Sequence, residues 1–99
     1  MGKTWKNIKP HSVASRKKMR KKYGSRCFLD PMRYKYPICN RYNGKEECVG
    51  HYAAQYYLNI NIGKLKKKKK NKKSTKRIQK YLKIKNKSLK FTKKNCFIQ

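Results

Sequence analysis

Three cysteines and one histidine in the middle of the chain have a spacing that could hold a metal ion. Cys27, Cys39, Cys48 and His51 form the pattern C-x11-C-x8-C-x2-H. Four nitrogen and sulfur ligands in a tetrahedron are the set that a structural zinc ion takes. On a helix, Cys48 and His51 would lie on the same face. These four residues are therefore a candidate zinc site, and zinc is the one cofactor that the sequence suggests.

The same cysteines have two other interpretations, and the sequence leaves all three open. The C-x2-C pair that makes a zinc assignment specific is absent. Unbonded cysteines often behave as small buried apolar residues, and Cys27 could instead form a disulfide with Cys39 across a hairpin. Cys96 lies outside the spacing pattern, and we expect it to take no part. The N-terminus lacks the apolar segment of a secretory signal, so we expect a protein that is not secreted, in a reducing compartment where disulfides are rare.

No set of residues in the sequence is arranged for catalysis. The chain has three acidic residues and two histidines, and it contains no P-loop, no glycine-rich dinucleotide turn and no plausible Ser/His/Asp set. No apolar run approaches the ~20 residues that a membrane span needs. We therefore expect neither an enzyme with a small-molecule substrate nor a membrane-spanning protein.

The charge of the chain is very high and unevenly distributed. Lysine and arginine number 31 against three acids, for a net charge of +28. Residues 1–22 carry nine basic side chains and no acid, residues 23–62 carry five against all three acids, and residues 63–99 carry seventeen and no acid. Such a chain needs a polyanionic partner. We expect nucleic acid, DNA more than RNA, or acidic proteins.

The secondary structure expected around these residues is that of a small α+β fold. The first is a basic helix over 12–24, with Ser12 as its N-cap and Gly24 at its end. A β-hairpin follows, in which residues 27–29 pair with residues 34–39 across an Asp-Pro turn.

A second helix is expected over residues 45–60. Glu46 and Glu47 would occupy its first turn, and an apolar face recurs at three- and four-residue spacing. That face consists of Val49, Ala53, Tyr56, Tyr57 and Ile60.

The chain accordingly divides into three segments. Residues 1–11 form a basic arm, residues 12–62 form the helix–hairpin–helix core, and residues 63–99 form a lysine-rich tail. Five successive lysines repel one another, so the tail should be largely disordered when free, with a weak helix over about 76–90. Trp5, in the arm, either docks on the core or a partner or remains solvated.

Basic residues in two of these segments are the candidate nucleic-acid contacts. The structured set lies on the first helix: Arg16, Lys17, Lys18, Arg20, Lys21 and Lys22. The flexible set lies in the tail: Lys66, Lys67, Lys68, Lys69, Lys70, Lys72, Lys73, Lys76 and Arg77. Seven of the eight tyrosines fall within residues 23–57 beside arginines. We expect most of these rings to build the core, with stacking on single-stranded bases and anchoring of a protein interface as the alternatives.

The segments "GSRCFLDP" at 24–31 and "KYPICN" at 35–40, with Cys48 and the Ala53-Ala54 pair, carry a resemblance. Over residues 12–60 the chain resembles an uncharacterised family of small, basic, cysteine-containing proteins of large eukaryotic DNA viruses, the algal-virus and giant-virus group. The resemblance implies a location in the virion, the infected-cell nucleus or the cytoplasmic viral factory. It implies no mechanism and no ligand for the cysteines.

These observations together predict a non-enzymatic, basic viral protein. It would bind nucleic acid electrostatically, in association with the genome or its packaging. The alternative is a structural protein of the virion that cements capsid proteins. A third hypothesis is a host-interaction protein that the lysine run directs to the nucleus.

Overall fold

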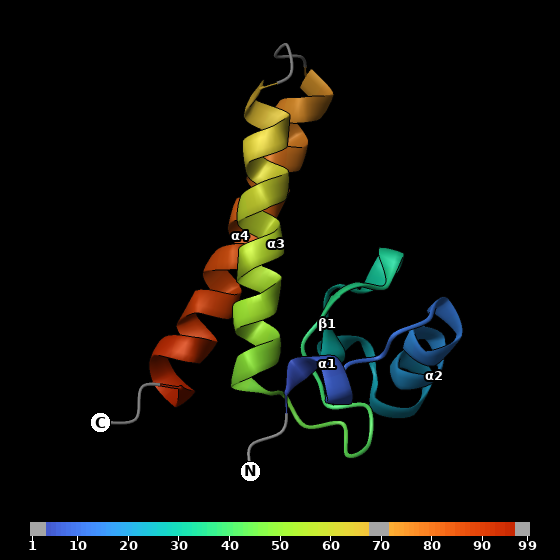
Figure 1. The fold of residues 1–99 in the computed structure, drawn as a ribbon. Coiled ribbons are helices and arrows are strands. Elements are labelled where there is room, and N and C mark those ends of the chain that lie inside the picture. Colours follow the sequence, from blue (N-terminus) through green and yellow to red (C-terminus); the bar gives the residue numbers. More distant parts are fainter. Residues whose placement is uncertain (1–3, 68–71, 97–99) are drawn as a thin grey trace.

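A long antiparallel pair of helices dominates the structure, and a smaller α+β unit packs beside it (Figure 1). The structure is a computed structural model that describes residues 4–67 and 72–96, with residues 72–74 as backbone only. Helices α3 (Cys48–Lys67) and α4 (Lys72–Asn95) form the pair. The N-terminal half lies along the first half of α3. The predicted class, small α+β with a two-stranded antiparallel hairpin, is confirmed.

The N-terminal region contains a one-turn helix, α1 (Trp5–Ile8), and the predicted basic helix, α2 (Val13–Tyr23). Ser12 caps α2, since its side chain accepts a hydrogen bond from the Ser15 amide at 3.0 Å. Gly24 ends the helix with φ 97° and donates its N–H to the Arg20 carbonyl. Both predicted boundary residues are therefore confirmed, and Gly24 has a conformation that residues with a Cβ rarely adopt.

The hairpin is shorter and less regular than the sequence indicates. Strand β1 (Phe28–Asp30) pairs with β2 (Lys35–Pro37), with Phe28 opposite Pro37. Two 3-10 turns flank β1, namely η1 (Ser25–Cys27) and η2 (Pro31–Arg33). Tyr34 and Tyr36 have φ values of 55° and 58°. This left-handed conformation is uncommon for tyrosine and interrupts the expected strand.

Helix α3 differs from its prediction in both boundaries and orientation. It begins at Cys48, so Glu46 and Glu47 precede it rather than forming its first turn; the Glu47 carbonyl accepts the His51 N–H at 3.1 Å. It ends at Lys67, beyond the end expected at residue 60. Its buried positions are Gly50, His51, Ala54, Leu58, Ile62 and Leu65. The face predicted to be buried is instead largely exposed.

Helix α4 explains why the other face of α3 is buried. It packs antiparallel along α3 (Figure 1), where Tyr81 is buried and Ile78 and Ile84 are partly buried. The helix expected over 76–90 is present and longer, and the described part of residues 63–99 is helical where a largely disordered tail was expected. The thin apolar stripe of α4 gains a partner that the isolated segment lacks, and tertiary packing supplies most helical stability. Within the described residues, neither long helix is apolar enough to cross a bilayer.

Candidate nucleic-acid interface

Six lysines form one continuous stripe along α4. Their spacing alternates between four and three residues, which keeps them on the same side of a helix. They are Lys76, Lys80, Lys83, Lys87, Lys90 and Lys94, and all are exposed. At 1.5 Å per residue the stripe is about 27 Å long. The stripe is thus a rigid linear array of positive charge.

All three acidic side chains of the chain make contacts within the molecule, so they do little to offset the positive charge of the stripe. Asp30 is buried and its Oδ1 lies 3.4 Å from Nζ of Lys80. Glu46 contacts His51 at 3.0 Å, and Glu47 accepts a hydrogen bond from Asn40. Only Asp30 contacts a lysine of the stripe. Most of the positive charge of the stripe therefore faces solvent without a neighbouring carboxylate.

The six candidate residues of α2 divide into two groups. Lys17, Lys18, Lys21 and Lys22 are exposed. The two arginines serve the fold: the Arg16 guanidinium donates to the Tyr34 carbonyl at 3.0 Å, and the Arg20 guanidinium lies 5.7 Å from the centre of the Tyr34 ring. A second, smaller basic surface therefore consists of the four lysines of α2.

Only some of the candidate residues in the lysine-rich segment lie in the part of the chain that the structure describes. Lys66 and Lys67 are exposed in the last turn of α3, and Lys76 and Arg77 are exposed in the first half of α4. Lys68, Lys69 and Lys70 lie outside the described residues, as do the side chains of Lys72 and Lys73. Sequence reasoning missed the stripe from Lys80 to Lys94, although its alternating spacing is readable in the sequence.

The predicted zinc set is not assembled. Cys27 forms a disulfide with Cys39, which is the alternative pairing predicted across the hairpin. Cys48 forms a second disulfide with Cys96, so the expectation that Cys96 takes no part was wrong. The described residues contain no group of three or more His, Cys, Asp or Glu side chains placed to hold a metal. The antiparallel packing of α4 brings Cys96 back to the start of α3, which spacing along the chain does not reveal.

His51, the fourth predicted ligand, belongs instead to a buried polar network between α3 and α4. Its Nδ1 lies 2.6 Å from Ser88 Oγ, and its Nε2 lies 3.0 Å from Glu46 Oε1. Gln55 donates to Ser88 Oγ at 3.0 Å, and the His51 ring stacks on Phe91 at 4.0 Å. A neutral ring that donates from Nε2 and accepts at Nδ1 satisfies every partner.

The network joins serine, histidine and glutamate, but its burial makes it structural. Ser88 is fully buried, so a substrate cannot reach its hydroxyl. Burial also lowers the pKa of His51, and this effect exceeds the opposing influence of the hydrogen bond and charge of Glu46. The imidazole is therefore held neutral near pH 7, where it aligns the two helices.

The tyrosines are less buried than predicted. Tyr36 and Tyr81 lie in the core with their rings edge to face at 6.0 Å, and burial raises the pKa of Tyr36. Four others are largely exposed: Tyr42, Tyr52, Tyr56 and Tyr57. Three of these lie on α3, outside its buried face. Exposed rings beside cationic surfaces are available for stacking.

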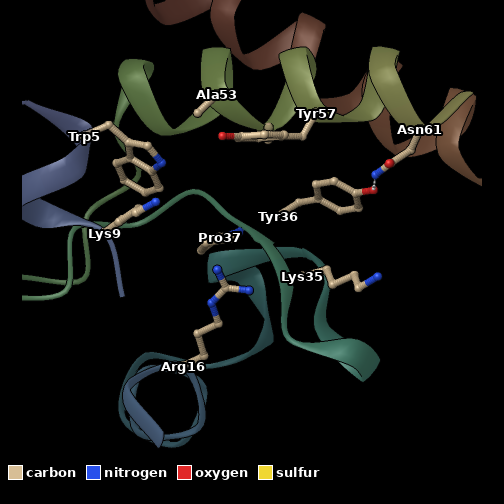
Figure 2. A pocket seen from close by; sticks show the side chains of 10 residues that line it. Trp5, Lys9, Arg16, Lys35, Tyr36, Pro37, Ala53, Tyr57 and Asn61 are labelled. Carbon is tan, nitrogen blue, oxygen red and sulfur yellow. Dashed lines mark hydrogen bonds between the residues drawn. The ribbon is translucent and has the colours of Figure 1, made fainter. Parts of the chain in front are cut away.

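A cleft of about 350 Å³ opens between α3 and the N-terminal unit. In Figure 2, Trp5, Ala53 and Tyr57 line its α3 side, and the Lys9 amine and the Arg16 guanidinium point toward it from the other side. Lys35 and Asn61 lie at its far end, where Asn61 donates a hydrogen bond to the Tyr36 hydroxyl. Sequence reasoning left the role of Trp5 open and did not predict this cleft.

No protein-family model, no curated protein and no solved structure matches this chain. The resemblance to a viral family therefore stays a prediction, and the function must be inferred from the site itself.

Proposed function

We propose that this protein binds nucleic acid through charge, without catalysis and with little choice of sequence. The observation that carries the proposal is the exposed stripe of six lysines on α4. One strand of DNA presents a phosphate about every 3.4 Å of helix axis, so a stripe of about 27 Å spans the axial length of about eight phosphates. Phosphate contacts of this kind supply affinity and do not read bases.

The side chains of the stripe support binding without sequence preference. Lysine presents a compact charge on a flexible stem and lacks the rigid two-pronged geometry with which arginine reads a guanine edge. The second surface, on α2, lies on the other side of the N-terminal unit from α4 (Figure 1). The two surfaces therefore contact separate stretches of a long polyanion, as expected of a protein that associates with a genome or its packaging.

The salt dependence of binding tests this proposal. The dissociation constant for a fluorescent duplex DNA, and for RNA of the same length, is measured by anisotropy over a series of salt concentrations. Each phosphate contact contributes about −0.9 to the log–log slope on duplex DNA. Replacing Lys83, Lys90 and Lys94 together with glutamine should therefore reduce the slope by up to about 2.7 units.

A matched control changes polar residues of the same helix that carry no charge. The double variant Gln79→Ala/Asn86→Ala should keep the wild-type slope, because both side chains are exposed and neutral. Absence of binding to both nucleic acids, or binding that salt does not weaken, contradicts the proposal.

A second candidate is a structural virion component that cements acidic capsid proteins. The observation that favours it is the exposed apolar face of α3, which includes Val49, Tyr52, Tyr56 and Ile60, since exposed aromatic patches often mark protein interfaces. Nuclease treatment of purified particles separates the two candidates. Release of the protein with the digested genome supports nucleic-acid binding, and retention in empty shells supports cementing.

A further inference from the structure

The cleft beside Trp5 brings aromatic rings and cations together. Ten residues line it, and among them are three cations, Lys9, Arg16 and Lys35, but no acid. The aromatic side chains of Trp5 and Tyr57 lie on the same wall, separated by the small Ala53 (Figure 2). Its volume of about 350 Å³ is in the range of small-ligand sites. Aromatic faces beside cations suit a planar ring that is attached to phosphate.

The wall of the cleft is built into the fold. The Trp5 indole lies so close to α3 that a Cβ on Gly50 would come within 2.9 Å of the ring and 2.9 Å of the Ile38 carbonyl oxygen. Glycine at this position therefore lets the indole rest against the helix backbone. Tyr57 lies two turns further along α3 and is 55% exposed. The two rings thus border one opening: Tyr57 belongs to α3, and Trp5 belongs to α1 and packs against α3.

One of the three cations, Arg16, is held in place by hydrogen bonds. Arg16 donates from Nε to the Pro10 carbonyl at 3.4 Å and from its terminal nitrogen to the Tyr34 carbonyl at 3.0 Å. These bonds hold the guanidinium at the edge of the cleft. The Lys9 amine points into the cleft from the segment that follows α1 (Figure 2). A phosphate that enters the cleft would meet the Arg16 guanidinium already in place, with the Lys9 amine beside it.

We propose that this cleft binds one unpaired base of a single-stranded nucleic acid against Trp5 and Tyr57, with the adjoining phosphates on Lys9 and Arg16. The inference rests on the proposed function and deepens it, because it names single strands as a preferred target. In a duplex both faces of each base are covered by neighbouring pairs, so only an unpaired base can offer a face to the rings. Duplex DNA would still bind to the lysine stripe on α4.

Trp5 is the only tryptophan of the chain, so its fluorescence reports directly on the cleft. The full-length protein is titrated with a short oligothymidylate, with an abasic oligonucleotide of the same length, and with thymidine monophosphate. The oligothymidylate should quench Trp5 and bind about 5- to 150-fold more tightly than the abasic strand, which corresponds to stacking of one base. The monophosphate should bind much more weakly than the oligothymidylate, because it lacks neighbouring phosphates.

Variants of two adjacent tyrosines provide the matched control. Tyr57→Ala should reduce the preference for the oligothymidylate over the abasic strand, because only Trp5 remains to stack, and Tyr57→Phe should keep it because the ring remains. Tyr56→Ala should also keep it, since Tyr56 is exposed but does not line the cleft. Tyr57 is largely exposed, and circular dichroism should show that its variants retain the wild-type fold.

The outcomes separate the two proposals. If the two strands bind equally with no quenching of Trp5, or if Tyr57→Ala leaves the preference unchanged, the cleft is not a base site and the charge-based function stands. If the monophosphate binds as tightly as the oligothymidylate, the cleft is a site for free nucleotides, and the assignment to single strands is overturned. If neither strand nor duplex binds, both proposals are overturned.

Discussion

Removal of the Cys48–Cys96 disulfide should lower the stability of this protein more than any change on its surface. The bond joins the start of α3 to the residue after α4, and it closes a loop of 48 residues. Helix α4 carries the lysine stripe, whose like charges repel one another, and a thin apolar face holds it to α3. A covalent link at the open end of the helix pair limits how far the two segments can separate in the unfolded chain.

The size of the effect follows from the length of the loop. Closing a loop of 48 residues removes chain entropy equivalent to about 4 kcal/mol at 25 °C. The same relation yields about 3 kcal/mol for the separation of 12 residues between Cys27 and Cys39. Cys48 and Cys96 are only half-buried, so replacing them with serine leaves little cavity. The change in the free energy of unfolding of this variant therefore measures the effect of closing the loop.

The assay compares the wild-type protein with the Cys48→Ser/Cys96→Ser variant in urea, without reductant and at one fixed ionic strength. The free energy of unfolding should fall by about 4 kcal/mol, and the urea dependence should steepen because the unfolded chain becomes more open. Thiol titration of the denatured wild-type protein should find no free thiol before reduction and four after it. A loss of stability below about 1 kcal/mol, or free thiols in the unreduced protein, would refute the reasoning.

Three further predictions concern the interior. Burial lowers the pKa of His51 below the unfolded value of 6.5, so the unfolded chain binds the proton first as the pH falls. The free energy of unfolding measured in urea should then decrease below pH 6.5 by up to about 1.4 kcal/mol per pH unit until the folded pKa is reached, and His51→Gln should flatten this decrease. Lys80→Ala leaves the buried Asp30 carboxylate without its cation and should cost about 1–3 kcal/mol in thermal denaturation, whereas Lys83→Ala should cost less than about 0.5. Leu58→Ala removes a fully buried side chain and should cost about 2–5 kcal/mol in urea unfolding, so a cost below about 1 would show that α3 and α4 are not packed as described.

Local features of the chain can be predicted from the sequence alone. Ser12 and Gly24 mark the ends of α2 because capping depends on a few neighbouring residues. The hairpin could be predicted, and the sequence offered the pairing of Cys27 with Cys39 as one of three interpretations, because the two cysteines are only 12 positions apart. The charge of +28 depends on composition alone, and the prediction of a polyanionic partner follows from it.

Features that depend on residues distant in the chain cannot be predicted in this way. Three such features depend on α4: the pairing of Cys48 with Cys96, the role of His51 and the buried face of α3. The run of lysines led to the prediction of a disordered tail in place of this helix. The repulsion among lysines can be recognised from the sequence. The apolar surface that a helix buries against a partner helix cannot, because it depends on which helix packs there. The cleft has the same origin, because Trp5 and Tyr57 are far apart in the chain and meet only when α1 packs on α3. The sequence by itself therefore determined the charge and the local helix and turn signals, while only the tertiary structure decided which faces those helices bury and which side chains they bring together.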